Sequence, residues 1–270
     1  MKFFRSRVSR PQPSPVSRAR ALHQAGRYAE AEAEAGVAVR SLQRDDPDVA
    51  LALTVAALAV AAQGRPAEAL ATYDEALLVA GRIFGADHWQ TLKLRSDRAQ
   101  QLPALGRYAE CEAECAAVVR AATHGTGTEM RLTAAAAGNG MAFALNSQGR
   151  HVEAEAIARE ALSTLREPDR LVLALRIGLA RALNGQARYG EALAEAAGAE
   201  QLRSGFPPEW RGQEAGSVEL VTADALRGLG RDAEARVRAA TAHDACLASF
   251  GPDHRRTIEA RSFLDRLDGA

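Results

Sequence analysis

The sequence predicts an all-α protein that folds as a solenoid of helix–turn–helix units. Three observations support this: a short motif recurs six times along the 270 residues, apolar residues around each copy follow helical spacing, and no segment alternates with the two-residue period of a strand. We therefore expect six units and about thirteen helices, each unit burying the apolar face of its neighbour.

The recurring motif is a glycine or alanine followed by arginine, with a glutamate three residues after the arginine. Its copies begin at Gly26, Gly64, Gly106, Gly149, Ala187 and Gly230, at intervals of 38, 42, 43, 38 and 43 residues. Glycine suits the left-handed conformation that ends a helix, and a glutamate early in a helix complements the positive end of the helix dipole. Each motif is therefore expected to be the turn between two helices.

The two helices of a unit are expected to pack through small side chains. Counted from the start of the motif, alanine or another packing residue stands five, nine and twelve positions later, which is one helical face. On the other side, alanine stands seven positions earlier and leucine or valine four positions earlier. Two loops share the pattern Phe-Gly-x-Asp-His, at residues 84–88 and 250–254. Their glycines are expected to end one helix and their aspartates, Asp87 and Asp253, to cap the next.

This pattern resembles the tetratricopeptide repeat (TPR), and most closely its longer variety of about 42 residues, found in kinesin light chain and many bacterial proteins. Gly64, Ala69, Tyr73 and Ala76 fit the glycine, alanine, aromatic and alanine positions of that repeat. The resemblance covers about residues 15–268. It implies a right-handed superhelix whose concave wall, built from the first helix of each unit, binds an extended peptide or a partner helix.

The sequence departs from the family pattern in a few units. Arg98 and Thr222 stand where a leucine is usual, and Ala187 replaces the turn glycine of the fifth unit. These departures affect the expected binding surface more than the fold.

The composition indicates a soluble, cytoplasmic chain with one folded domain over residues 15–270. Lysine and arginine balance aspartate and glutamate at 34 each, which disfavours nucleic acid as a partner. The longest apolar run, residues 49–62, is too short for a transmembrane segment. Three cysteines favour a reducing compartment. Residues 1–14 are basic and are expected to form a disordered tail; an alternative is contact with anionic lipid or an acidic partner.

Several residues invite a chemical interpretation that the repeat register argues against. Cys111 and Cys115 occupy packing positions of the third unit, so we expect them to be buried rather than to bind metal or act in redox chemistry; the same holds for Cys246. Trp89 and Trp210 are expected to cover seams between units, with an exposed binding anchor as the alternative. We predict no catalytic residue, no cofactor and no metal site.

The concave wall supplies the candidate binding residues. Positions ten, six and three before each turn share a face of the first helix. In units four to six the candidate groove residues on this face are Asn139, Phe143, Asn146, Arg181, Asn184, Asp224 and Arg227. The asparagines can bond a peptide backbone, the arginines can hold a carboxylate, and Phe143 offers an apolar floor. Pro103, in the third unit, is expected to bend its helix.

The leading interpretation is a non-catalytic interaction module that binds a peptide or partner protein, with acidic groups favoured, in this groove. One alternative is a peptide- or ligand-responsive sensor that controls a separate effector. Another is a self-assembling scaffold or accessory subunit of a biosynthetic complex, which would use the convex surface or the terminal helix. An enzyme is disfavoured, because no constellation of reactive residues survives the repeat alignment.

Overall fold

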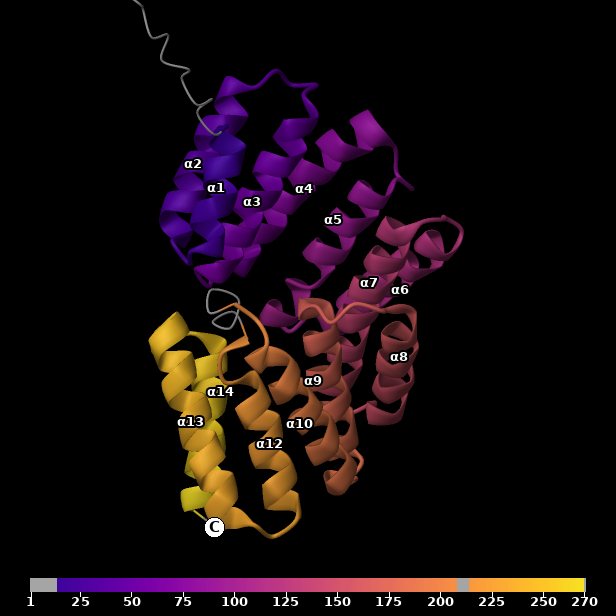
Figure 1. Ribbon diagram of the computed structural model, residues 1–270. Coiled ribbons are helices and arrows are strands. Elements are labelled where there is room, and N and C mark those ends of the chain that lie inside the picture. The colour runs from indigo at the N-terminus through magenta and orange to yellow at the C-terminus, as the bar shows by residue number, and fades with distance from the viewer. Residues whose placement is uncertain (1–13, 208–213, 270) are drawn as a thin grey trace, which may run out of the picture.

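The computed structural model describes residues 14–207 and 214–269, which form thirteen α-helices and one 3-10 helix and contain no strand (Figure 1). The first helices of the units are α1 (Pro15–Gln24), α3 (Pro47–Ala62), α5 (Trp89–Ala99), α7 (Thr128–Ser147), α9 (Arg170–Gly185), α12 (Ser217–Gly228) and the terminal α14 (Arg255–Asp268). The second helices are α2 (Tyr28–Ser41), α4 (Pro66–Phe84), α6 (Tyr108–Thr123), α8 (His151–Thr164), α10 (Tyr189–Ser204) and α13 (Asp232–Phe250). The predicted all-α solenoid is confirmed, whereas the expected basic tail lies almost wholly outside the described residues.

The helices stack in chain order and the stack curls, so that α13 and α14 come to lie below α1 and α2 in Figure 1. Each helix packs against the next one, and most first helices also pack against the first helix of the following unit. This second kind of packing is weak in two places, between α3 and α5 and between α12 and α14. The curl gives the molecule an inner wall of first helices and an outer layer of second helices.

All six turns have the same backbone geometry. The five glycines have φ between 72° and 76°, and Ala187 takes the same left-handed region with φ 58°. In each turn the arginine N–H donates to the carbonyl of the leucine or valine that precedes it by five residues, over 2.9–3.3 Å. This is the bond that closes a Schellman motif, and it sets the direction of the second helix.

The turn arginine is also clamped by its side chain. In every unit its Nε and Nη2 donate to the two carboxylate oxygens of the motif glutamate; in the fourth unit the Arg150–Glu153 distances are 2.7 and 2.6 Å. The ion pair lowers the pKa of Glu153 and raises that of Arg150, as in the other units. The sequence indicated a dipole role for these glutamates, and the structure adds this two-pronged side-chain bond.

The clamp extends across three of the seams between units. The third donor of the arginine, Nη1, reaches a glutamate on the second helix of the preceding unit in the pairs Arg65–Glu32, Arg150–Glu112 and Arg188–Glu155, over 2.6–2.9 Å. At the other two seams that glutamate is replaced by Leu70 and Leu193. The residue before the turn changes with it, from glutamine to leucine. The contacts between neighbouring units are therefore of two kinds, three with an arginine–glutamate ion pair and two with a leucine in place of the glutamate.

The small residues form the core between the layers. Every residue at the three predicted positions of the second helices is buried, and so is the alanine seven positions before each turn. Tyr73, the largest of them, is fully buried. Because most of these side chains are alanine, neighbouring helices approach closely and the core is thin. The predicted packing faces are confirmed.

The first helix of the third unit is interrupted before Pro103, where the sequence analysis predicted a bend. Helix α5 ends at Ala99, and Leu102–Leu105 form the 3-10 helix η1, with Leu102 and Pro103 buried. Proline has no N–H to donate and its ring clashes with the preceding turn of an α-helix. The tighter 3-10 turn brings the chain back to Gly106 and places Gln100 and Gln101 beside the hollow of the curl.

The two Phe-Gly-x-Asp-His loops have the same structure. The prediction that their aspartates cap the next helix is wrong. Gly85 and Gly251 end their helices as expected, with φ 91° and 84°. The capping side chains are His88 and His254, whose Nδ1 atoms accept from backbone N–H groups two residues later. The helices begin one residue later than predicted, so each aspartate stands outside the cap position. Both imidazoles stack on the phenylalanine of the loop, at 5.0 and 4.5 Å.

Trp89 is half-buried at the start of α5, beside His88 at 5.8 Å between ring centroids. That position is consistent with a seam-covering role. Trp210 lies outside the described residues, so its predicted role is untested.

The fifth turn provides a test of the backbone geometry. Replacing Ala187→Gly should raise the free energy of unfolding by about 0.5–1 kcal/mol, because a left-handed conformation costs an L-residue about 1–2 kcal/mol and glycine loses part of this gain as entropy. Gly149→Ala is the matched control and should lose a similar amount, since a Cβ there would meet no atom within 4 Å. Urea denaturation measures both. A loss of stability in Ala187→Gly would contradict the interpretation of the turn.

The histidine cap of α14 predicts a pH dependence of stability. Burial, together with Arg256 and Arg255, lowers the pKa of His254 in the folded state. The unfolded chain therefore binds more protons below about pH 6.5, and stability should fall as the pH drops through that value. Replacing His254→Asn keeps a capping side chain that does not titrate. Its stability should fall less steeply between about pH 7.5 and 5.5 in urea titrations; equal slopes would contradict the cap assignment.

Candidate functional site

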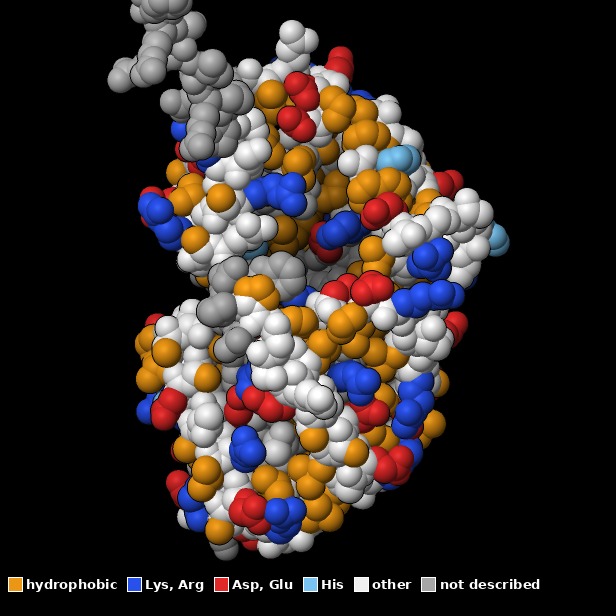
Figure 2. Space-filling model, viewed as in Figure 1, with side chains coloured by type: hydrophobic (Ala, Val, Ile, Leu, Met, Phe, Trp, Pro, Cys, Tyr) orange, Lys and Arg blue, Asp and Glu red, His pale blue; other side chains and the backbone are white. Residues whose placement is uncertain are grey.

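The hollow of the curl is a cavity of about 720 Å³ on the concave side. Figure 2 shows the surface hollowed between the part formed by α1–α5 and the part formed by the later helices. Its lining comes mainly from the first helices other than α5, from Gln100, Gln101 and η1, and from the loop between α13 and α14. His23 and Tyr28 from the start of the solenoid and Phe250 and His254 from its end line the same cavity. The curl thus brings the two ends of the repeat array around one chamber.

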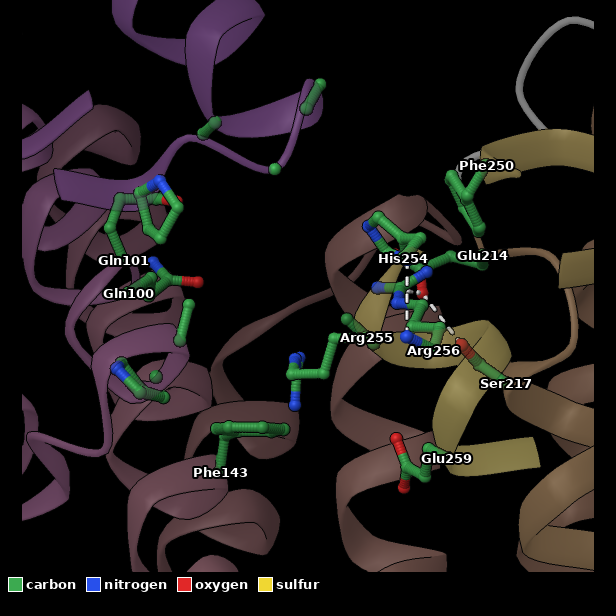
Figure 3. Close-up of a pocket in the computed structure, with 18 of the residues that line it drawn as sticks. Gln100, Gln101, Phe143, Glu214, Ser217, Phe250, His254, Arg255, Arg256 and Glu259 are labelled. Carbon is green, nitrogen blue, oxygen red and sulfur yellow. Dashed lines mark hydrogen bonds and ion pairs between the residues drawn. The ribbon is translucent and has the colours of Figure 1, made fainter. Parts of the chain in front are cut away.

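Phe143 of α7 forms an apolar platform in the chamber, and two arginines lie over its ring. The guanidinium carbon of Arg181, from α9, is 5.8 Å from the ring centroid. That of Arg255, from α14, is 5.4 Å away, and Figure 3 shows Arg255 and Phe143 facing each other across the chamber. These are cation–π distances. The aromatic ring therefore holds two positive charges at one place on the inner wall.

The arginines differ in their ionic partners. Nη2 of Arg181 lies 3.7 Å from Oε1 of Glu259, and Arg256 lies 3.4 Å from Glu214. Arg255 has no carboxylate within salt-bridge distance among the described residues. Burial lowers the pKa of Arg255, Glu259 opposes this effect, and Arg256 and Arg181 add to it. The side chain of Arg255 is nevertheless exposed to solvent, so it is an accessible cation with which an anionic ligand could pair.

Four of the seven predicted groove residues line the chamber, namely Asn139, Phe143, Asn146 and Arg181, whereas Asn184, Asp224 and Arg227 do not. Asp224 and Arg227 pair with each other at 3.2 Å, and Arg227 lies over the ring of Phe263 at 5.6 Å. These two residues connect α12 to α14 at a distance from the chamber.

Two of the asparagines tie neighbouring units together. Asn146 donates from Nδ2 to the carbonyl of Gly178 over 3.0 Å, and Asn184 donates in the same way to Val221 over 2.9 Å. They occupy the same position in successive units, and their acceptors also correspond. Asn184 is buried. The amide groups that the sequence offered to a peptide backbone are therefore engaged with the backbone of the next first helix.

Arg255 and Glu259 were missed because the predicted face was followed only from the six turns backward. The residues of α14 that line the chamber, Arg255 and Glu259, lie at the start of that helix, and no predicted turn follows α14 from which the face could be counted. Ala174 and Ser217 line the chamber at the corresponding level of α9 and α12. Extending the same helical face toward the helix starts, and applying it to the last helix, would have found all four.

A family model for the tetratricopeptide repeat matches residues 49–90 and 134–167. The chain therefore contains tetratricopeptide repeats over these residues. No curated protein matches the sequence. Among solved structures, the TPR-like repeats of a putative kinesin light chain from Podosopora anserina share 21% identity, cover 71% of this chain and 93% of theirs, and superpose with a TM-score of 0.55.

Two further TPR structures superpose over more of the chain. A Rap protein complexed with competence and sporulation factor has a TM-score of 0.64 at 13% identity, covering 94% of this chain and 74% of its own. PlcR of Bacillus thuringiensis, in complex with the peptide PapR7 and DNA, has a TM-score of 0.62 at 15% identity, covering 83% and 76%. At these identities the likeness concerns the fold.

The cysteines of this TPR protein are packing residues, as predicted. Cys111 and Cys115 are fully buried and unpaired by disulfides, and Cys246 is buried as well. A hydrogen bond with Cys111, and burial, raise the pKa of Cys115. The Sγ of Cys115 lies where a side chain at Gly140 of α7 would stand, so the thiol fills the space left by that glycine. A raised pKa disfavours the thiolate that redox chemistry requires.

Within the described ranges, no three His, Cys, Asp or Glu side chains come together in a way that could hold a metal ion. None of the described helices combines the length and the hydropathy needed to cross a membrane.

The asparagine ties of the TPR seams predict a difference between Asn184 and Asn139. Asn184→Ala should lower the free energy of unfolding by about 0.5–1.5 kcal/mol, because it removes a buried hydrogen bond to the carbonyl of Val221. Asn139→Ala, on the same face but without a hydrogen bond to the described residues, should change it by less than about 0.5 kcal/mol. Urea denaturation measures both. Equal losses would show that the contact with Val221 does not stabilise the seam.

Proposed function

We propose that this protein is a non-catalytic interaction module that binds a short acidic peptide segment in the chamber. The observation that carries the proposal is the arrangement of Arg255 and Arg181 over Phe143 on the concave side of the solenoid. A guanidinium binds a carboxylate through two parallel hydrogen bonds, and the ring beneath it keeps its plane open to the chamber.

The size and lining of the chamber fit a peptide better than a globular partner. Its volume of about 720 Å³ falls within the range of about 300–1,000 Å³ of ligand pockets. Gln100, Gln101 and Asn139 add amide groups to the wall that can bond a peptide backbone.

The solved TPR structures support the same class of ligand. The structure of the Rap protein holds competence and sporulation factor, and that of PlcR holds the peptide PapR7. Both superpose on this chain with TM-scores above 0.6. This likeness also favours the second candidate function, a sensor in which the peptide changes the curl of the solenoid and so controls a separate effector chain.

Self-assembly through the terminal helix has less support. The outward positions of α14 carry Arg261, Ser262, Asp265 and Arg266, all exposed. A polar outer face is typical of the capping helix of a repeat array, which prevents further stacking.

We also propose a cytoplasmic location, as inferred from the sequence, and the three free thiols are compatible with it.

A displayed library of random heptapeptides tests the proposal. We expect selection on the immobilised protein to enrich aspartate and glutamate. The selected peptides should bind Arg255→Glu at least tenfold more weakly by fluorescence anisotropy, because a hydrogen-bonded carboxylate on an arginine contributes about 1.5–3 kcal/mol.

Arg261→Glu is the matched control: it makes the same charge change on the same helix, at an exposed residue that does not line the chamber. It should retain most of the affinity, and circular dichroism should show both variants folded. Selected peptides without acidic residues, or equal losses in the two variants, would contradict the proposal.

A further inference from the structure

Helix α14 is attached to the solenoid differently from the other first helices. Its buried residues Phe263 and Leu267 share a cluster with Ala223 and Leu226 of α12 and with Ala235 and Ala239 of α13, but the backbones of α12 and α14 approach each other closely at few points. By contrast, α9 packs against both α7 and α12 along its length. The side of the first two turns of α14 that faces the chamber is therefore held by contacts made across the chamber.

The contacts across the chamber are made by Arg255 and Glu259. Arg255 lies over Phe143, and Glu259 faces Arg181 at 3.7 Å. That distance exceeds the roughly 2.7–2.9 Å of a close charge-assisted hydrogen bond. The side chains of Arg181 and Glu259 are 28% and 42% exposed, so water reaches both. An ion pair of this kind is weak and readily exchanged for another carboxylate.

We propose that Glu259 is an internal competitor of the ligand: its carboxylate occupies on Arg181 the position that a carboxylate of the bound peptide takes. The inference rests on the proposed function, since it assigns a second acidic group to the same ligand. One carboxylate of the peptide pairs with Arg255, which has none of its own among the described residues. A second carboxylate replaces Glu259 on Arg181 and releases α14 from α9.

Two consequences follow for specificity. Because Arg181 and Arg255 lie over the same ring, the two carboxylates must stand close together in the peptide, on neighbouring residues or at its acidic end. A peptide with a single acidic group gains only the contact with Arg255 and leaves the contact between α9 and α14 intact. Glu259 thus favours peptides with paired acidic groups, and α14 moves only when such a peptide binds.

The alternative is that Glu259 acts only through its charge, as any acid beside the chamber would. Glu214 provides the comparison, because it also lines the chamber but pairs with Arg256 instead of Arg181. A general charge effect would be the same for both glutamates and would not depend on Arg181.

Fluorescence anisotropy with fluorescein-labelled hexaglutamate, and hexaglutamine as the neutral probe, distinguishes these cases in full-length protein at low salt. Glu259→Gln should bind hexaglutamate about two- to fivefold more tightly than the unaltered protein, the gain expected from freeing one exposed arginine. The gain should disappear in Arg181→Gln/Glu259→Gln relative to Arg181→Gln alone. Glu214→Gln should produce a smaller gain that persists without Arg181, and hexaglutamine should not bind.

The competitor role would be overturned by equal affinities of the unaltered protein and Glu259→Gln, by a gain that persists in the Arg181→Gln background, or by an equal gain from Glu214→Gln. In each of these cases hexaglutamate still binds, so the proposed function stands. If no variant binds hexaglutamate, the proposed function fails and the competitor role fails with it.

Discussion

The structure depends most on one hydrogen bond, made six times, from the amide of the turn arginine to the carbonyl of the core leucine or valine five residues before it. This bond requires a left-handed residue between the two, so glycine or a tolerated alanine stands there in every unit. It sets the angle between the two helices of a unit. Since each unit repeats that angle, the curl of the whole solenoid is the sum of six similar local geometries.

The curl in turn determines what the inner wall can do. A less curved stack would present Phe143 and Arg181 on an open groove. Helix α5 ends at Ala99, α3 and α5 make few contacts, and the array curls enough for its first and last helices to line one chamber. Phe143, Arg181 and Arg255 come from the fourth, fifth and terminal helices of the inner wall. Their meeting is a property of the superhelix and of no single repeat.

The difference between features of a single repeat and features of the whole superhelix explains how much could be predicted from the sequence. Helices, turns and packing faces are local or nearest-neighbour features, so the recurrence of Ala31, Ala69 and Cys111 at one position was enough to assign them. The turn glutamates were also found, although their side-chain bond to arginine was not. The cap of α14 was misassigned by one residue, because aspartate is a common capping residue and the acceptor nitrogen of His254 was not considered. Errors of this kind leave the stack unchanged.

The candidate site was predicted less well, and for a physical reason. A polar residue on the inner wall can either face the chamber or tie two units together, and the sequence of one unit does not distinguish these. Asn184 donates to Val221 and is buried, whereas Asn139, about two helical turns nearer the start of its own helix on the corresponding face, lines the chamber. Arg255 and Glu259 lie beyond the last turn, where the repeat register no longer identifies the face.

The same reasoning indicates why the terminal helix is the place for a control element. Each first helix from α3 to α12 lies between two neighbouring units, so moving it would break the packing on both sides. Helix α14 has a neighbouring unit on one side, where Phe263 and Leu267 pack in one cluster with residues of α12 and α13, and its tie to α9 is a long, solvated ion pair. Displacing that tie costs little compared with opening a buried seam such as the one closed by Arg203 and Glu219. A ligand that binds at Phe143 therefore acts on the one inner-wall helix whose position it can change without unstacking the solenoid.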